Sequence, residues 1–269
     1  MTIHMEPVLR FEDVHVDFGG VKAVDGVSLS VAAGALHAII GPNGSGKTTL
    51  LNAVSGFVRA TGSISLLGHE IAHEAAYRRV HRGLGRTFQN PHGDHTLTVR
   101  QLLRLGAHRR SPSPWWVAAV APRRHDHRLV EFDARASVQL ERVGLTSDVL
   151  DVRLVDLSAG VAKLVDLVRA LLGEPGVLLL DEPTSGMNVE EIHALQSLLS
   201  EMRASDLTVV LVEHNLDFVG AACDKVTVLA SGSVLGSGAL DEVLALPQVV
   251  EAYFGARQAT SLPSVIPQS

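Results

Sequence analysis

The sequence contains a single cysteine, Cys223, among its 269 residues. One thiol cannot form a disulfide within the chain, so we expect a reducing compartment and a small buried core thiol. No apolar run approaches the roughly 18 to 20 residues needed to cross a bilayer. The N-terminal residues 1–13 also lack the basic-then-apolar order of a secretory signal. We therefore expect a soluble, cytoplasmic chain, whose mildly positive mean hydropathy still permits contact with a membrane protein.

Charged and aromatic residues are also scarce. With 46% hydrophobic and 19% charged residues, the composition is typical of a globular protein and excludes general disorder. The net charge of −6 gives no general reason to expect nucleic-acid binding. The length suits one large domain or two small ones.

Short apolar or alternating segments predict two kinds of β-sheet. Residues 8–18 and 24–34 alternate like antiparallel strands with one wet face. Residues 176–182 and 207–213 contain continuous apolar runs, as in a parallel sheet covered on both faces. Further strand-like segments are 35–41, 62–68 and 225–238.

Helical patterns lie between these strands in the second half. Residues 161–172 and 190–204 each place apolar side chains on one stripe. Their alternation with strands predicts right-handed βαβ units.

The segment "GPNGSGKTT" at residues 41–49 matches the phosphate-binding loop pattern G-x-x-x-x-G-K-[ST]. It follows a strand-like run and precedes a helix-like one, which is the context the motif requires. The glycines let backbone N–H groups point at phosphates, Lys47 is expected to reach the β and γ phosphates, and the Thr48 hydroxyl to hold Mg²⁺. The predicted nucleotide-binding residues of this loop are Gly41, Asn43, Gly44, Ser45, Gly46, Lys47, Thr48 and Thr49.

A pair of carboxylates, Asp181 and Glu182, follows the buried run "VLLL". The carboxyl ends of parallel strands are where open α/β sheets bind ligands. We expect Asp181 to hold Mg²⁺ through water, and Glu182 to orient or deprotonate the attacking water. No N-K-x-D guanine motif occurs in the chain, so ATP is favoured over GTP.

The order of motifs resembles the ATP-binding subunit of ABC transporters, from about residue 8 to 255, which we take as the ABC ATPase domain. The matching residues are Phe18 in "DFGGVKAV", the loop 41–49, Gln89 in "GRTFQN", "LSAG" at 157–160, Asp181 and Glu182, "SGMN" at 185–188 and His214 in "LVEHN". The segments "GRTFQN", "SGMN", "VEHN" and "VVEAYFG" look most like the branched-chain amino acid and urea importer branch.

The resemblance implies an α/β fold: a P-loop, RecA-like core with a mixed sheet, an N-terminal antiparallel β subdomain and an inserted α-helical subdomain. We place that insertion at about residues 91–165 and expect 256–269 to be a flexible tail. Within the insertion, the segment 91–130 carries Trp115, Trp116 and several arginines. It is expected either to meet the transmembrane subunit or lipid headgroups, or to be a solvated basic loop.

The resemblance also implies roles for single residues. Phe18 would stack on adenine, Gln89 would reach Mg²⁺ or the lytic water, and His214 would hydrogen-bond the γ-phosphate. Two subunits of this family pair head to tail, so Ser158 and Gly160 of one would meet the γ-phosphate held by the other. Bound ATP would close that dimer and hydrolysis would reopen it.

This chain departs from the family's Leu-Ser-Gly-Gly-Gln segment at Ala159 and Val161. A glutamine three residues after Ser158 can complete a capping box, whereas valine cannot. We therefore expect this half-site to close on ATP but to support slower turnover of the nucleotide that its partner holds.

The expected function is an ATPase that powers an importer for branched-chain amino acids or a related small polar solute. Expected partners are a second ATPase subunit, identical or not, transmembrane permease subunits and, indirectly, a solute-binding protein, without nucleic acid. The expected location is the cytoplasmic side of the cell membrane. Alternatives are a lipid or lipopolysaccharide export ATPase and a soluble non-transport ABC ATPase.

Overall fold

The computed structural model describes residues 7–88, 96–107 and 122–254. Within these ranges, helices that are both long and apolar enough to span a bilayer are absent. Gln89, Trp115 and Trp116 lie outside the described residues, as does the expected tail at 256–269.

An antiparallel sheet of four strands opens the chain. It contains β1 (Pro7–Phe18), β2 (Val21–Ala32), β4 (Thr61–Leu66) and β5 (His69–Glu70), in the order β2-β1-β4-β5. Residues of β1 alternate in burial: Leu9 and Phe11 are buried, whereas Arg10 and Glu12, which follow them, are exposed. The predicted antiparallel strands with one wet face are thus confirmed.

A second, six-stranded sheet has the order β10-β9-β3-β8-β7-β6. Its strands are β3 (Leu36–Ile40), β6 (Leu84–Arg86), β7 (Val177–Asp181), β8 (Thr208–Val212), β9 (Lys225–Ala230) and β10 (Ser233–Gly238). All neighbours pair in parallel except β10, which runs antiparallel to β9. Every residue of β3, β7 and β8 is buried, as their continuous apolar runs predict. The predicted mixed sheet is confirmed.

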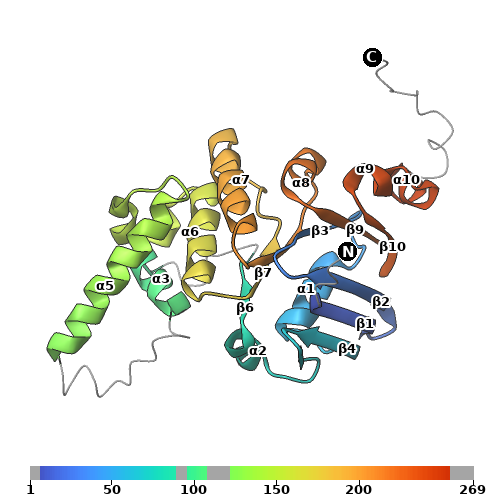
Figure 1. Cartoon of the computed structure of the whole chain (residues 1–269), viewed down its shortest axis with the longest axis horizontal. Coiled ribbons are helices and arrows are strands. Elements are labelled where there is room, and N and C mark those ends of the chain that lie inside the picture. Colours follow the sequence, from blue (N-terminus) through green and yellow to red (C-terminus); the bar gives the residue numbers. More distant parts are fainter. Residues whose placement is uncertain (1–6, 89–95, 108–121, 255–269) are drawn as a thin grey trace, which may run out of the picture.

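Helix α1 (Lys47–Ser55) lies between the two sheets (Figure 1). Its Leu50 and Val54 belong to one core cluster with Leu9 of the antiparallel sheet and Ile39 of the six-stranded sheet. The opposite face of the six-stranded sheet is covered by α6 (Ala159–Leu172), α7 (Val189–Arg203) and α8 (Leu216–Ala222). The predicted helices 161–172 and 190–204 correspond to α6 and α7.

The remaining helices lie in separate regions of the molecule (Figure 1). The first, with α6 at its border, contains α3 (Val99–Ala107), α5 (Pro122–Glu141) and the 3₁₀ turns Ser147–Asp151 and Leu154–Asp156. These elements fall within the expected insertion at 91–165, although residue 165 itself lies inside α6. In a second region, the short α2 (Ala76–Arg82) lies next to β6. In a third, α9 (Leu240–Leu244) and α10 (Pro247–Phe254) pack next to β10.

Cys223 follows α8 and is half-buried beside the core. Burial raises the pKa of its thiol to about 12. The thiol is therefore protonated and inert at neutral pH, in keeping with the expected core role.

Candidate nucleotide-binding site

The loop 41–46 joins the end of β3 to the start of α1 and is tightly enclosed on one side. A Cβ atom added to Gly41 would lie 2.0 Å from the Leu229 carbonyl oxygen, and one added to Gly46 would lie 2.2 Å from that of Ala23. At Gly44, a Cβ would meet open space. Only glycine fits the enclosed positions, and the loop presents its open side to a ligand.

The Lys47 ammonium folds back over this loop. Its Nζ donates to the carbonyls of Gly41 at 2.8 Å and Pro42 at 2.9 Å. Burial lowers the pKa of Lys47, and the negative charges of Glu182 and Asp181 oppose that shift. A phosphate approaching the loop would therefore meet a desolvated cation next to the N-terminus of α1.

Asp181 ends β7 with a buried carboxylate. Its Oδ2 pairs with Nη2 of Arg86 at 3.1 Å. Its Oδ1 is buried and has no hydrogen-bond partner in the described part of the chain. Burial raises the pKa of Asp181, and the neighbouring Arg86 counteracts this.

This arrangement fits the magnesium ion that the family resemblance implies. The unpaired Oδ1 of Asp181 is a free acceptor for a metal-bound water, and a buried acceptor without a partner is costly unless a ligand satisfies it. Thr48 lies in the first turn of α1 and is exposed, so its hydroxyl is accessible as the second protein ligand. The third expected ligand, Gln89, lies outside the described residues.

Glu182 and His214 are brought together from the ends of two neighbouring strands. Nε2 of His214 lies 2.8 Å from Oε1 of Glu182. Glu182 has a φ of 47°, an uncommon left-handed conformation for a side-chain-bearing residue. Its backbone is held on both sides: its N–H donates to the Val212 carbonyl at 2.9 Å, and its carbonyl accepts from Lys163 Nζ at 2.6 Å. The surrounding structure thus holds the Glu182 backbone in a strained conformation, as often occurs at active sites.

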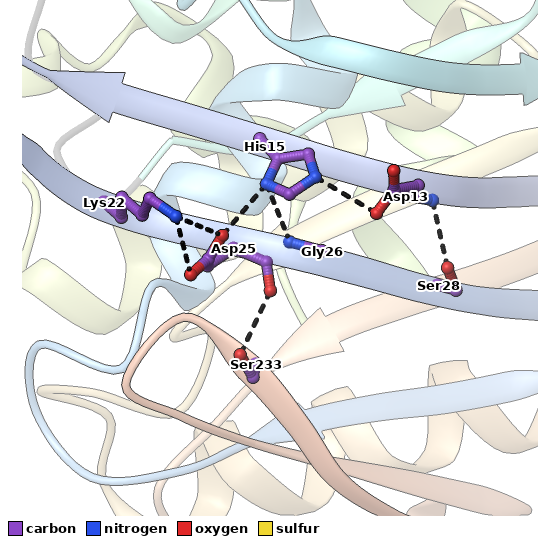
Figure 2. Close-up of polar contacts among 7 residues, drawn as sticks. All are labelled: Asp13, His15, Lys22, Asp25, Gly26, Ser28 and Ser233. Carbon is purple, nitrogen blue, oxygen red and sulfur yellow. Dashed lines mark hydrogen bonds and ion pairs between the residues drawn. The ribbon is translucent and has the colours of Figure 1, made fainter.

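Phe18 ends β1, at the turn into β2, and its side chain is 53% exposed. The hairpin behind it is braced by His15, whose Nδ1 lies 3.0 Å from Asp25 Oδ1 and whose Nε2 lies 3.0 Å from Asp13 Oδ1 (Figure 2). Lys22 also donates to both oxygens of Asp25. The exposed ring is therefore presented on a braced hairpin, where an adenine can stack on it.

The same hairpin is tied to the phosphate loop. The Asp25 N–H donates to the Gly232 carbonyl at 2.8 Å, and the Gly232 N–H donates to the Ser45 carbonyl at 3.1 Å. Ser233 Oγ donates to the Asp25 carbonyl at 3.0 Å (Figure 2). One hydrogen-bonded path therefore links the Phe18 hairpin to the loop at 41–46, and it sets the separation between the expected adenine and phosphate subsites.

Ser158 caps the N-terminus of α6, where its Oγ accepts from the Val161 N–H at 3.2 Å. The same Oγ donates to Oε1 of Glu191 at 3.3 Å. Helix α6 covers the face of the six-stranded sheet opposite to α1. Ser158 and Gly160 are therefore separated by the sheet from the helix that begins at Lys47 of the same chain.

Three polar residues of the site were not predicted from the sequence: Arg86, Lys163 and Glu191. Arg86 lies in the quoted segment "GRTFQN", but nothing in the sequence pairs it with Asp181. Lys163 interrupts the first turns of an apolar helix, which is a weak signal. Glu191 had a clear sequence signal, because an Asn-x-x-Glu spacing that starts at Asn188 is typical of a capping box. The structure contains that capping box.

A polar clamp joins α6 to the strand that leads to Gln89. Asp166, which is buried, accepts from the Phe88 N–H at 2.8 Å. Arg169 donates to Asp166 at 2.6 Å and to the Arg86 carbonyl at 2.7 Å. The helix that begins at Ser158 and the segment before Gln89 are thus held together through partly buried hydrogen bonds.

Comparison with known proteins agrees with this geometry. Residues 24–185 match the ABC transporter family. The chain is 34% identical to the "Probable branched-chain amino acid transport ATP-binding protein LivG" of Methanocaldococcus jannaschii, covering 92% of this chain and 97% of the relative. It is 32% identical to the high-affinity branched-chain amino acid transport ATP-binding protein BraF of Pseudomonas aeruginosa, covering 93% and 98%.

A solved structure supports the same assignment. The crystal structure of an ATP-binding cassette of an ABC transporter in its ADP conformation superposes with a TM-score of 0.77 at 32% identity, covering 93% of this chain and all of that one. The resemblance inferred from the motifs is confirmed: the chain belongs to the ABC transporter family, as one of its nucleotide-binding, ATP-hydrolysing subunits.

Proposed function

We propose that this chain is the ATPase that powers an importer for branched-chain amino acids or a related small polar solute. The names of its relatives support the solute class. The observation that carries the catalytic assignment is the contact of Glu182 with His214 at 2.8 Å, next to the unpaired oxygen of Asp181. A carboxylate that can accept a proton from water, a histidine and a buried unpaired oxygen at the carboxyl ends of adjacent strands support hydrolysis of a phosphoanhydride.

Each residue has a separate task in this proposal. Lys47 and the N–H groups of the loop 41–46 bind the β and γ phosphates. Thr48, Gln89 and Asp181 hold Mg²⁺, which neutralises phosphate charge when bound. Glu182 accepts a proton from the attacking water, while His214 orients Glu182 and hydrogen-bonds the γ-phosphate.

A head-to-tail dimer supplies the second half of each site. The sheet separates Ser158 and Gly160 from the α1 face of their own chain. The helix N-terminus at Ser158 is nevertheless built to receive an anion. In the dimer, Ser158 and Gly160 of one subunit close over the nucleotide of the other, and hydrolysis reopens the pair.

The permease subunits dock next to Phe88, on the cytoplasmic side of the membrane. Phe57 and Phe88 are 54% and 41% exposed, with ring centroids 6.0 Å apart. They border a cavity between the ATPase core and the helical region, together with Arg86 and Arg169. Exposed aromatic rings that pack against arginines are typical of protein interfaces. A permease segment seated here would contact Phe88, which directly precedes Gln89 in the sequence.

The Glu182→Gln variant tests the proposal. Loss of the general base should abolish phosphate release, with ATP binding retained, so that ATP should convert the variant to a stable dimer in size-exclusion chromatography. Hydrolysis at the parental rate, or a monomer at saturating Mg-ATP, would refute the catalytic or the dimer assignment, respectively. Co-purification from membranes should recover permease subunits, and the solute that stimulates ATPase activity of that complex identifies the substrate.

A further inference from the structure

Glu191 lies in the first turn of α7, where it contacts the N-terminus of α6. Its Oε2 accepts from the Asn188 N–H at 2.8 Å, and its Oε1 accepts from Ser158 Oγ at 3.3 Å. A Cβ atom on Gly160 would come within 1.9 Å of Oε2. The carboxylate therefore rests against the bare Cα of Gly160 and accepts a hydrogen bond from the Ser158 hydroxyl.

This contact places a negative charge at a helix start that favours anions. The N-terminus of α6 carries unpaired N–H groups and the positive end of the helix dipole. No basic side chain forms an ion pair with Glu191 among the residues that the structure describes. In the absence of a phosphate, the Glu191 carboxylate is thus the anion at the N-terminus of α6.

We propose that Glu191 competes with the γ-phosphate of the nucleotide held by the partner subunit, and so sets the ATP concentration at which the two subunits close. This inference rests on the proposed head-to-tail dimer. A phosphate that reaches this helix start meets the Glu191 carboxylate, which is hydrogen-bonded to Ser158 and packed on Gly160. Two negative charges cannot both occupy this helix start at low cost, so Glu191 must turn away as the subunits close.

The displacement has a second consequence, because Glu191 also closes the capping box of α7. Asn188 Oδ1 accepts from the Glu191 N–H at 2.9 Å, while the Glu191 side chain accepts from the Asn188 N–H. When the carboxylate turns away, the Asn188 N–H loses its partner. Residues 185–188 follow Glu182 closely in the chain, so closure at α6 loosens the segment just after the proposed general base.

The test compares Glu191→Gln with Glu190→Gln. Both variants remove one negative charge from the first turn of α7, but Glu190 is exposed and has no hydrogen bond to Ser158. Glutamine at position 191 retains an acceptor for the Asn188 N–H, so the fold is preserved, and thermal unfolding checks this. A further variant, Glu191→Asp, keeps the charge but withdraws it from Ser158.

Each substitution is made in the Glu182→Gln background, and ATP-dependent pairing is followed by sizing across an ATP titration. Glu191→Gln should lower the ATP concentration for half-maximal pairing by about tenfold, since like-charge contacts of this kind cost at least that much. Glu191→Asp should lower it by a smaller factor, and Glu190→Gln should change it by less than about twofold. In the presence of Ser158→Ala, the gain from Glu191→Gln should shrink, because the shared hydroxyl is gone.

Three results separate the possible failures. Equal midpoints for Glu191→Gln and Glu190→Gln would overturn the competition while leaving the dimer intact. A higher midpoint for Glu191→Gln would show that Glu191 only supports the helix start, which also overturns it. If no variant pairs with ATP although each binds it, the head-to-tail dimer itself is wrong and the inference falls with it.

Discussion

Arg86 and Asp181 form a buried ion pair, in which Nη2 lies 3.1 Å from Oδ2 and the two side chains are 8% and 2% exposed. The arginine comes from β6, just before Gln89, and the aspartate ends the adjacent strand β7. The guanidinium also lies over the rings of Phe57 and Phe88, at 5.4 and 5.8 Å from their centroids. One side chain therefore connects the proposed permease-docking surface with the carboxylate expected to hold Mg²⁺.

Replacing Arg86 with glutamine should lower the free energy of unfolding by about 3 kcal/mol, because it leaves the Asp181 carboxylate buried without its partner. Urea denaturation measures this change. Arg82→Gln is the matched control: Arg82 pairs with Glu74 at 2.8 Å, but its own side chain is 39% exposed. That loss of stability should be much smaller, because solvent screens an exposed ion pair. Similar losses in both variants would mean that the buried pair contributes no more than a surface one.

His37 should make stability fall in mild acid. Its Nε2 lies 2.8 Å from Thr227 Oγ1, and burial lowers the pKa of His37 from 6.5 to about 4, with a smaller contribution from Lys225. As pH drops below 6.5, the unfolded chain binds a proton at this histidine before the folded chain does. The folded state is thereby disfavoured by about 3 kcal/mol when pH reaches 4.

The measurement is the free energy of unfolding of the parent and of His37→Gln between pH 7 and 4. Glutamine can still donate to Thr227 but does not titrate, so the variant should lose less stability than the parent as pH falls. His73→Gln, at an exposed histidine, should keep the parental pH dependence. Parallel curves for the parent and His37→Gln would contradict the prediction.

Two glycines of the phosphate loop should respond differently to alanine. Gly46 and Gly44 have φ values of 99° and 77°, so either substitution introduces backbone strain of roughly 1 kcal/mol. At Gly46 the new methyl would also press on the Ala23 carbonyl oxygen, which raises the expected loss to about 3 kcal/mol. Unfolding without nucleotide isolates this effect from phosphate binding. Equal losses at the two positions would show that the backbone at Ala23 moves aside easily.

Val161→Gln should speed turnover of the nucleotide held by the partner. Ser158 caps α6 through the Val161 N–H, but valine offers no side-chain group to the Ser158 N–H in return. Glutamine would complete the capping box, which stabilises such a helix start by roughly 1 kcal/mol. Steady-state phosphate release measures turnover, with Val161→Ala as a control that lacks the amide. An unchanged rate in Val161→Gln would refute the expected slow half-site.

The expected roles of the site residues depend on contacts that the sequence could not reveal. Arg86 and Asp181 are 95 residues apart, and Ser158 and Glu191 are 33 apart. No periodicity relates such positions, because the sheet order and the packing of α6 against α7 decide which chain segments meet. β6 was missed for a related reason, since its three residues are too few for a pattern. The predicted strand 225–238 is in fact two, because Ser231 and Gly232 adopt left-handed backbone conformations and turn the chain.

By itself, the sequence determined the features that depend on neighbouring residues. The glycine spacing of 41–49 specifies the phosphate loop, continuous apolar runs specify the buried strands β7 and β8, and a serine before an apolar stripe specifies the start of α6. Only the tertiary structure decided that His214 meets Glu182, that Arg86 shields one oxygen of Asp181, and that Glu191 covers Gly160. Local chemistry shapes a loop or a helix start, whereas contacts between distant residues arise only when strands pair and helices pack.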